Sequence, residues 1–172
     1  LAGAPSVLHC HHFNLFLDQT IDDALGDEAG ATLRRNAARQ ASSELLASLG
    51  AEGQTPLERL EIAKSTFAAM GQGRLEMNVS DDGGEVLSSS LHYWLCWKEK
   101  YGVRIPRRVP ADEFAGGFAA AATTWAYGKD PSSLGVREVE CVAQRHPRCR
   151  FEVRQAMHPL PAMPDVDLHA IK

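Results

Sequence analysis

The stretch Gly135–Val153, GVREVECVAQRHPRCRFEV, carries the most information about the fold. Both of its ends have the pattern of extended strands, and the turn-forming residues QRHP lie between them, so the stretch predicts an antiparallel β-hairpin. If the turn is centred on Arg145, Cys141 lies directly opposite Cys149 and both thiols point to the same face. Opposed side chains have Cβ atoms about 4.5 to 5.5 Å apart, close enough for two thiolates to share one tetrahedral metal ion.

Two thiolates do not complete a zinc site, so the donors nearby matter. Glu138, Glu140 and His146 are close in sequence, but both glutamates have the wrong strand parity relative to Cys141. Either glutamate becomes a ligand only if the strand bulges, begins late, or lets the carboxylate swing around its edge. On their own, the two cysteines leave three interpretations open, which are a metal site, a disulfide and a pair of buried thiols.

Length, charge and composition limit the class of protein. A chain of 172 residues fits one domain with one core, and we expect that domain to span residues 1–156, followed by a Pro-rich tail at 157–172. With 18 basic and 22 acidic residues the net charge is −4, which argues against nucleic-acid binding. No apolar run approaches the roughly 18 residues that a membrane span needs. We therefore expect a cytoplasmic protein without a membrane partner.

The first third of the chain predicts three helices. Apolar residues recur at helical spacing from Phe13 to Leu25, and a second helix is expected over Ala31–Leu49. A third helix begins after Thr55, where Pro56 and Glu58 complete the signature of a capping box. In the second helix we expect one stripe of residues to pack on the core, namely Leu33, Ala37, Ala41, Leu45 and Leu49.

The remaining elements alternate between hairpins and helices. Residues 75–86 alternate apolar and polar side chains around an Asp-Asp-Gly-Gly turn, which predicts a hairpin. The stretch 91–102, LHYWLCWKEKYG, is expected to be a short helix that ends at Gly102, and an Ala-rich helix is expected over Asp112–Tyr127. Gly116 and Gly117 in that helix allow close approach by a neighbour or a ligand. Because no βαβ alternation occurs, the fold class is α+β with an antiparallel sheet.

The pattern E-V-E-C-x7-C-R-F at residues 138–151 resembles the closing signature of the four-vinyl-reductase domain. This module occurs in bacteriochlorophyll-synthesis proteins and in the sensor halves of phenol- and xylene-responsive activators. The resemblance covers roughly residues 73–153 and is specific in its last 20 residues. It implies N-terminal helices packed on an antiparallel sheet made of two hairpins, similar to the fold of haem NO-binding domains and TRAPP subunits.

The same resemblance implies a structural zinc ion. In the phenol sensors of this family, zinc is held by a glutamate three residues before the first cysteine of the pair, by both cysteines, and by a cysteine ahead of the preceding helix. Carried onto this sequence, the ligands are Glu138, Cys141 and Cys149, and the fourth position falls on Asp112. A carboxylate oxygen is an acceptable zinc ligand. Other candidates for the fourth position are Cys96 and His92.

The N-terminal segment His9-Cys10-His11-His12 gathers four potential ligands or acid–base groups just before the first helix. Three interpretations compete. The side chains cap the helix and fill polar gaps, they hold a second transition metal or a haem, or Cys10, His11 and His12 are catalytic, with the thiol activated by a histidine. In an extended segment His9 and His11 face away from Cys10 and His12. The family resemblance does not cover this segment.

Aromatic residues are concentrated between the two expected hairpins. They form either ordinary core or the wall of an apolar pocket for a small hydrophobic or aromatic molecule, with one histidine bonded to the polar end of that molecule. The resemblance favours the pocket. The residues expected to contact the ligand are His9, His92, Trp94, Phe118 and Trp125.

These observations lead to one principal hypothesis of function and two alternatives. We expect a stand-alone, homodimeric, zinc-stabilised domain that binds a small hydrophobic or aromatic molecule and lacks an ATPase or DNA-binding partner domain. The first alternative is a metal- or Cys/His-dependent enzyme of small-molecule or tetrapyrrole metabolism that uses the His9–His12 segment. The second is a structural assembly module similar to the trafficking subunits.

Overall fold

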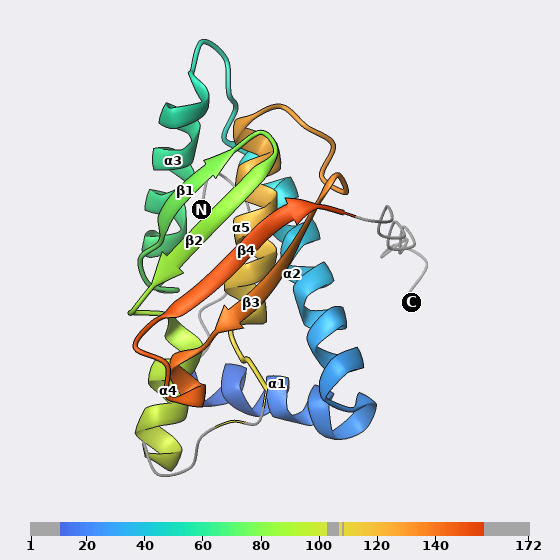
Figure 1. The fold of residues 1–172 in the computed structure, drawn as a ribbon, viewed down its shortest axis with the longest axis vertical. Helices are drawn as coiled ribbons and strands as arrows, with labels where there is room; N and C mark the ends of the chain where they lie inside the picture. The colour runs from blue at the N-terminus through green and yellow to red at the C-terminus, as the bar shows by residue number, and fades with distance from the viewer. Residues whose placement is uncertain (1–10, 103–106, 108, 157–172) are drawn as a thin grey trace, which may run out of the picture.

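A computed structural model describes residues 11–102, 107 and 109–156 (Figure 1). The N-terminal helices are α1 (His11–Leu25), α2 (Asp27–Ser48) and α3 (Pro56–Ala69). A hairpin of β1 (Glu76–Ser80) and β2 (Gly83–Ser88) follows, and then helices α4 (His92–Tyr101) and α5 (Glu113–Ala126). The final hairpin consists of β3 (Leu134–Glu140), the 3-10 turn η1 (Val142–Gln144) and β4 (Cys149–Gln155). The segments 1–10 and 157–172, which include the expected tail, lie outside the described residues.

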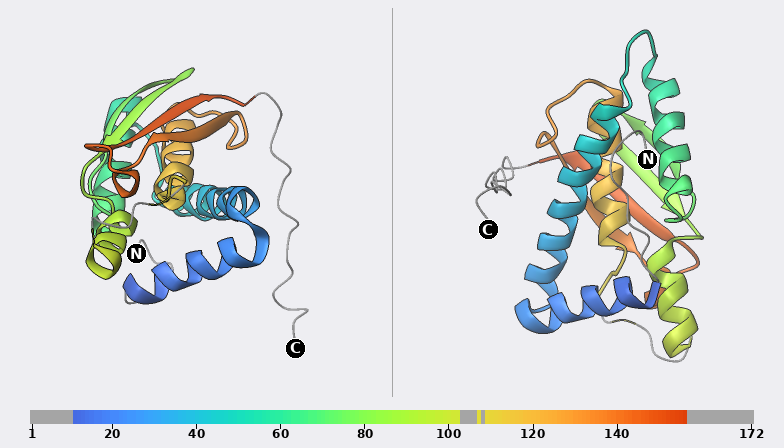
Figure 2. Two further views of the ribbon diagram at one scale, coloured as in Figure 1. Left: turned by 60° about the horizontal axis from the view of Figure 1, so that its bottom comes forward. Right: turned by 180° about the vertical axis from the view of Figure 1, so that it is seen from behind.

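The four described strands form one antiparallel sheet in the order β1-β2-β4-β3. The pairing of β2 with β4 joins the two hairpins, so the expected α+β class and the two-hairpin sheet are confirmed. Helix α5 lies against the inner face of the sheet and α2 packs behind α5 (Figures 1 and 2). The inner face carries fully buried side chains such as Val86, Phe151 and Val153, which form the core together with Phe118 of α5.

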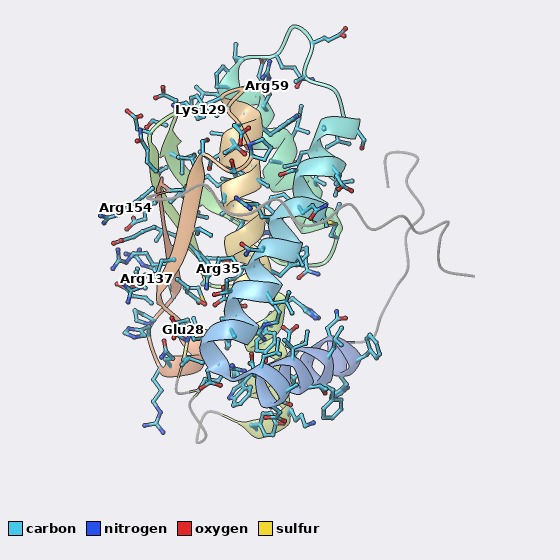
Figure 3. All side chains as sticks on the ribbon, turned by 90° about the vertical axis from the view of Figure 1, so that its right-hand side faces the viewer. Glu28, Arg35, Arg59, Lys129, Arg137 and Arg154 are labelled. Carbon is cyan, nitrogen blue, oxygen red and sulfur yellow. The ribbon has the colours of Figure 1, made fainter. Side chains whose placement is uncertain are left out.

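Helices α2 and α5 pack very closely, and Gly117 makes this possible. A Cβ atom at Gly117 would lie 2.4 Å from the Arg35 carbonyl oxygen and 2.8 Å from the Ala38 Cβ. The expected close approach of a neighbour is therefore confirmed at Gly117. Arg35 also contacts both α5 and the sheet: its guanidinium donates to the Glu113 carboxylate of α5 at 2.6 Å and to the Val136 carbonyl of β3 at 3.3 Å (Figure 3 labels Arg35).

The stripe predicted for α2 is wrong in its first three residues. Leu33, Ala37 and Ala41 are exposed, whereas Leu45 is half-buried and Leu49 packs against the core. The buried face is made of Gly30, Ala31, Arg34, Ala38, Ser42 and Leu46. Next to Gly117 the close packing against α5 leaves room only for the small side chain of Ala38. Arg34 lies on this face because it forms a buried ion pair with α1.

Several local predictions are confirmed by the structure. Helix α3 begins with a complete capping box, because the Thr55 hydroxyl accepts from the Glu58 N–H and the Glu58 carboxylate accepts from the Thr55 N–H. Helix α4 ends at Gly102, which adopts a positive φ of 68°.

None of the helices in the described ranges has both the length and the apolar character required to cross a bilayer.

Candidate metal centre

Four acidic side chains converge at the end of the last hairpin. Asp112, Glu138, Cys141 and Cys149 are all buried, and one ligand atom of each lies within 4.8 Å of the others. They come from three places in the fold, because Asp112 directly precedes α5, Glu138 and Cys141 lie at the end of β3, and Cys149 begins β4. These are the four residues that the resemblance implies as zinc ligands, and the structure brings them together.

A register shift in β3 explains how Glu138 can face the same side of the sheet as Cys141. Glu138 pairs with Phe151 and Glu140 pairs with Arg150, so β3 advances by two residues while β4 advances by one. This is the geometry of a β-bulge, in which one extra residue lets the side chains on either side of it face the same way. Glu138 and Cys141 therefore both face the buried side of the sheet, and a bulge was one of the three arrangements that the sequence left open.

The connection between the two cysteines turns a backbone amide toward the sulfur of Cys149. After Cys141 the chain forms one 3-10 turn and reverses at Arg145, which adopts the left-handed conformation with a φ of 75°. The Val142 N–H then lies 3.4 Å from the Cys149 sulfur. An N–H donor stabilises a thiolate more than a thiol, so this turn is suited to a metal-bound cysteine.

Glu138 has one oxygen that is fixed and one that is available. Its Oε2 atom accepts hydrogen bonds from the backbone N–H groups of Ala111 and Asp112, at 3.0 and 2.9 Å. Its Oε1 atom is fully buried and makes no hydrogen bond to any described residue. A buried carboxylate oxygen without a partner is costly. A cation bound between the four side chains would satisfy it.

Asp112 completes the cluster from the side of α5. Its Oδ2 atom lies 3.3 Å from the Cys149 sulfur and 3.7 Å from the Cys141 sulfur. The backbone N–H of Trp94, in the first turn of α4, also acts on this carboxyl and lowers its pKa, although burial and the Cys141 sulfur raise that pKa by more. The Asp112 carboxyl thus lies between the hairpin and the start of α4.

The protonation of the metal-free cluster follows from the closeness of its groups. Burial raises the pKa values of Asp112 and Glu138 well above their usual range, and the neighbouring charges raise them further. The hydrogen bond from Cys149 lowers the pKa of Cys141 to about 6, while the same bond and burial raise the pKa of Cys149. Four such groups cannot all be ionised without a cation, so metal binding would release protons.

The donor set fits zinc. Zinc binds cysteine sulfur and carboxylate oxygen alike, and four protein ligands are typical of a structural site with no position left for a reactive water. The described cysteines Cys96, Cys141 and Cys149 are all free thiols, so the alternative of a Cys141–Cys149 disulfide is not realised in this structure. Cys96 and His92 lie apart from the cluster as a pair one helical turn apart, with 3.7 Å between the sulfur and the imidazole nitrogens.

The structure describes little of the N-terminal histidine segment. His9 and Cys10 lie outside the described residues, and of His11 only its place at the start of α1 is described. His12 is exposed on α1 and does not belong to the metal cluster. The catalytic role of Cys10, His11 and His12, and with it the alternative of an enzyme, stays a prediction.

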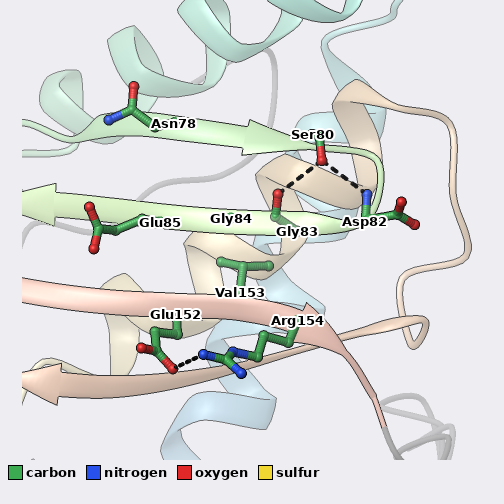
Figure 4. A pocket seen from close by; sticks show the side chains of 9 residues that line it. All are labelled: Asn78, Ser80, Asp82, Gly83, Gly84, Glu85, Glu152, Val153 and Arg154. Atoms are coloured by element: carbon green, nitrogen blue, oxygen red, sulfur yellow. Dashed lines mark hydrogen bonds and ion pairs between the residues drawn. The ribbon is translucent and has the colours of Figure 1, made fainter.

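The aromatic residues expected to contact a ligand have different environments. Phe118 is fully buried, with its ring 4.8 Å from that of Phe67, and is part of the core. His92, Trp94 and Trp125 are half-buried, and the Trp94 Nε1 atom is buried without a hydrogen-bond acceptor among the described residues. A shallow polar groove along β1, β2 and β4 contains none of these residues (Figure 4); its lining is Asn78, Ser80, Asp82, Gly83, Gly84, Glu85, Glu152, Val153 and Arg154.

The sheet order, the helix pair behind it and the buried ligand cluster in the final hairpin define the class of this protein as an α+β domain with the fold of the phenol-sensor and four-vinyl-reductase domains. The sequence itself matches no protein-family model and no curated protein.

Two solved structures show the fold. The phenol-responsive sensory domain of the transcription activator PoxR, crystallised with phenol, is similar with a TM-score of 0.68 and 21% identity, over 87% of this chain and 76% of that one. A vinyl-4-reductase family protein from Methanocaldococcus jannaschii is similar with a TM-score of 0.55 and 20% identity, over 90% and 86% of the two chains. The relation expected from the last hairpin is confirmed at the level of the fold.

Proposed function

We propose that this chain is a small-molecule-binding domain in which a structural zinc ion fastens the last hairpin to the start of α5. The observation that carries the proposal is the buried cluster of two carboxyl and two thiol groups, within which Glu138 Oε1 has no partner in the described structure. Such a concentration of acidic groups is stable inside a protein when a cation neutralises it. The free thiols are in keeping with a reducing, cytoplasmic location.

Zinc would be held by Asp112, Glu138, Cys141 and Cys149, and it would supply structural cross-linking and no reaction. This ligand set is supported by the two backbone N–H groups at residues 111 and 112, just before α5, which orient the Glu138 carboxylate. The Val142 N–H likewise orients the Cys149 sulfur. The ion would therefore join the end of the hairpin to the start of α5, in addition to the packing of α5 on the sheet.

Metal analysis of protein purified without added metal tests the zinc centre. We expect about one zinc ion per chain in the wild type and a loss of zinc in the variant Cys149→Ser. The matched control is Cys96→Ser, which removes a buried thiol outside the cluster and should leave the zinc content unchanged. A folded Cys149→Ser protein with a full complement of zinc would exclude this ligand set.

The ligand part of the proposal is supported by Trp94. Its indole N–H is a donor that is buried without an acceptor in the described structure, and such donors are rare in native proteins. The similar PoxR domain was crystallised with phenol, whose hydroxyl oxygen is a suitable acceptor. We therefore propose a small aromatic ligand with a polar group, bound near Trp94, with His9 and His92 as further predicted contacts. Phe118 belongs to the core, and Trp125 lies at the opposite end of α5 from Asp112, which the Trp94 backbone contacts, so neither is part of this proposal.

Calorimetric titration with phenol and with benzene separates the two parts of this recognition. Replacing Trp94 by Phe keeps an aromatic ring but removes the N–H, so we expect phenol to bind about tenfold more weakly, because a net hydrogen bond contributes roughly 1 to 1.5 kcal/mol. Benzene makes no such bond, and its affinity should stay within about twofold of the wild-type value. Equal losses for both compounds would mean that Trp94 acts only by packing.

We also propose that the domain is a homodimer, as expected from its similarity to sensor domains. Helix α1 exposes large apolar side chains, with Phe16 at 49% and Leu17 at 47% of their full accessibility. Exposed apolar patches of this kind are typical of protein interfaces. Analytical ultracentrifugation should show a dimer for the wild type and a monomer for Leu17→Glu, and a monomeric wild type would contradict the proposal.

A further inference from the structure

Arg107 connects the loop of the metal hairpin to two helices. Its backbone N–H donates to the Ala143 carbonyl at 2.8 Å, within the loop between the two cysteines. Its guanidinium divides between two partners: Nη1 donates to the Tyr93 hydroxyl of α4 at 2.8 Å, and Nη2 donates to Asp22 Oδ2 of α1 at 3.0 Å. The Arg107 side chain is only 7% exposed. One buried residue therefore contacts the hairpin, α4 and α1.

On α4, Arg107 holds the turn that carries Trp94. Its guanidinium lies 5.0 Å from the centre of the Trp97 ring and 5.5 Å from that of the Tyr93 ring, both within the range of cation–π attraction. Tyr93 is buried and directly precedes Trp94, whose indole N–H is proposed to bind ligand. Arg107, whose backbone is bound to the hairpin loop, therefore helps to fix the turn of α4 that positions the Trp94 indole.

On α1, Arg107 is part of a buried ion cluster. Asp22 binds Arg107 at 3.0 Å and Arg34 of α2 at 2.9 Å, and the side chains of all three are at most 7% exposed. Gly30 leaves room for this arrangement, because a Cβ atom there would lie 2.5 Å from Asp22 Oδ1. Asp18 also lies 3.6 Å from Arg34, so two carboxyl groups lie beside the two guanidinium groups, and removing one member would leave a buried charge that is costly.

Helix α1 depends strongly on these polar contacts. It crosses the ends of α2 and α4 away from the sheet (Figure 2). Leu15 is its only fully buried apolar side chain in the described structure. A single residue, Gly26 with a φ of 83°, joins α1 to α2. The direct contacts of α1 with α4 include a hydrogen bond from the Tyr101 hydroxyl to Gln19 at 2.9 Å and the Lys100 ammonium over the Phe16 ring. A helix held by one fully buried leucine and mainly polar contacts is expected to have low local stability.

We propose that Arg107 is a positioning residue that couples the metal centre to the Trp94 turn of α4 and to α1. The proposal rests on the zinc centre of the proposed function. When the ligands Cys141 and Cys149 are held, the loop between them is fixed, and the Ala143 carbonyl anchors the Arg107 backbone. The guanidinium then reaches Tyr93 and Asp22 together. When the loop loosens, both contacts weaken, so metal occupancy controls the order of α1 and α4.

The forked guanidinium is needed for this coupling. Its two terminal nitrogens bind partners on different helices, whereas a lysine offers one compact ammonium group at the end of a flexible stem. The substitution Arg107→Lys therefore keeps the positive charge near Asp22 but cannot reproduce both contacts. A more selective change is Tyr93→Phe, which keeps the aromatic ring and removes only the hydroxyl that Nη1 binds.

Hydrogen–deuterium exchange, measured on metal-free and zinc-loaded protein, tests the coupling without any ligand. In the wild type, zinc should slow exchange about tenfold or more in the hairpin 141–149, in α4 and in α1, because a hydrogen bond to a charged group contributes at least 1.5 kcal/mol. In Arg107→Lys, zinc should slow exchange in the hairpin and in the first turn of α4, where the Trp94 N–H contacts the ligand Asp112, but not in the rest of α4 or in α1. In Tyr93→Phe, the effect should be lost in α4 beyond its first turn and kept in α1. Arg150→Lys, on the outer face of the sheet, is the control and should behave like the wild type.

The outcomes distinguish the coupling from the zinc centre. Slower exchange in the wild-type hairpin, without any change in α1 and α4, would overturn the coupling and leave the zinc centre intact. Slower exchange in all three segments of Arg107→Lys would show that Arg107 is not the route. Protein that binds no zinc would overturn both proposals. If Arg107→Lys does not fold, Tyr93→Phe decides, because an unchanged zinc effect on α4 beyond its first turn in that variant refutes the coupling.

Discussion

Replacing Glu138 by Gln changes one atom in the metal centre and has a specific structural consequence. The backbone N–H groups of Ala111 and Asp112 both donate to Oε2, so the amide oxygen of the glutamine must occupy that position. The amide NH2 group then takes the place of Oε1, the buried oxygen that lacks a partner among the described residues. The lone pair of an amide nitrogen is delocalised into the carbonyl group and does not bind a metal ion, so the variant loses a ligand while the surrounding packing is kept.

The size of the effect follows from metal affinity. Losing a hydrogen-bonded neighbour of a metal ligand costs about 10- to 100-fold in affinity, so losing a charged ligand should cost about 100-fold or more. This corresponds to about 2.7 kcal/mol, and with zinc in excess the same free energy is lost from the stability of the loaded protein. For a chain of this size, the melting temperature of the zinc-loaded variant should fall by about 5 to 11 °C.

The metal-free proteins should differ little, and this contrast makes the test specific. Burial raises the pKa of Glu138 well above its usual range and so favours the protonated carboxyl, which glutamine imitates, in the metal-free protein. Melting curves by circular dichroism, recorded with chelator and with excess zinc, measure both states. Glu140→Gln is the control, because that carboxylate pairs with Arg150 at 2.9 Å outside the cluster. A zinc-dependent rise in melting temperature that is as large in Glu138→Gln as in the wild type would refute the assignment of Glu138 as a ligand.

Three further predictions concern the scaffold. Gly117→Ala should destabilise the protein by about 2 kcal/mol in urea denaturation, because the new Cβ atom overlaps the backbone of α2 at Arg35. Gly116→Ala should instead stabilise the protein by about 0.5 to 1 kcal/mol, since the Cβ atom there meets only ordinary contacts at 3.6 Å. Equal effects of the two substitutions would contradict the close packing of α2 on α5. Thr55→Ala should cost about 1 kcal/mol in the same assay through loss of the capping box, and no change would mean that the end of α3 contributes nothing to stability. Burial raises the pKa of Asp18 to about 6, so the protonated carboxyl is favoured in the folded state and its contribution, complete below about pH 4, is lost as the pH rises through 6. Asp18→Asn should therefore flatten the fall in urea midpoint between about pH 4 and 6, and a fall as steep as that of the wild type would contradict the pKa assignment.

Local patterns in the sequence predicted those parts of the fold whose causes are local. The start of α3 follows from Thr55, Pro56 and Glu58, because a capping box involves only residues within one turn. The final hairpin follows from the alternation on either side of QRHP. The opposition of Cys141 and Cys149 follows from the symmetry of an antiparallel turn, although the exact pairing near Glu138 shifts by one residue.

The buried face of α2 could not be predicted in this way. Helical periodicity placed Leu33, Ala37 and Ala41 in the core stripe, but the partner of α2 is α5, and the close contact at Gly117 is made by the small residue Ala38. Burial of Arg34 needs the acidic partner Asp22 on another helix. Both facts depend on which elements meet, and helical periodicity contains no information about that.

The candidate metal centre was likewise predictable from the sequence only in part. The sequence alone determined that two thiols would oppose each other at the end of a β-hairpin, and the resemblance of that hairpin to a known signature indicated Glu138 and Asp112. Only the tertiary structure decided that a bulge turns Glu138 inward, that Asp112 reaches the same point from α5, and that Arg107 contacts three separate elements. Opposition across a hairpin follows from neighbouring backbone hydrogen bonds, whereas the convergence of residues far apart in the chain depends on the packing of the whole domain.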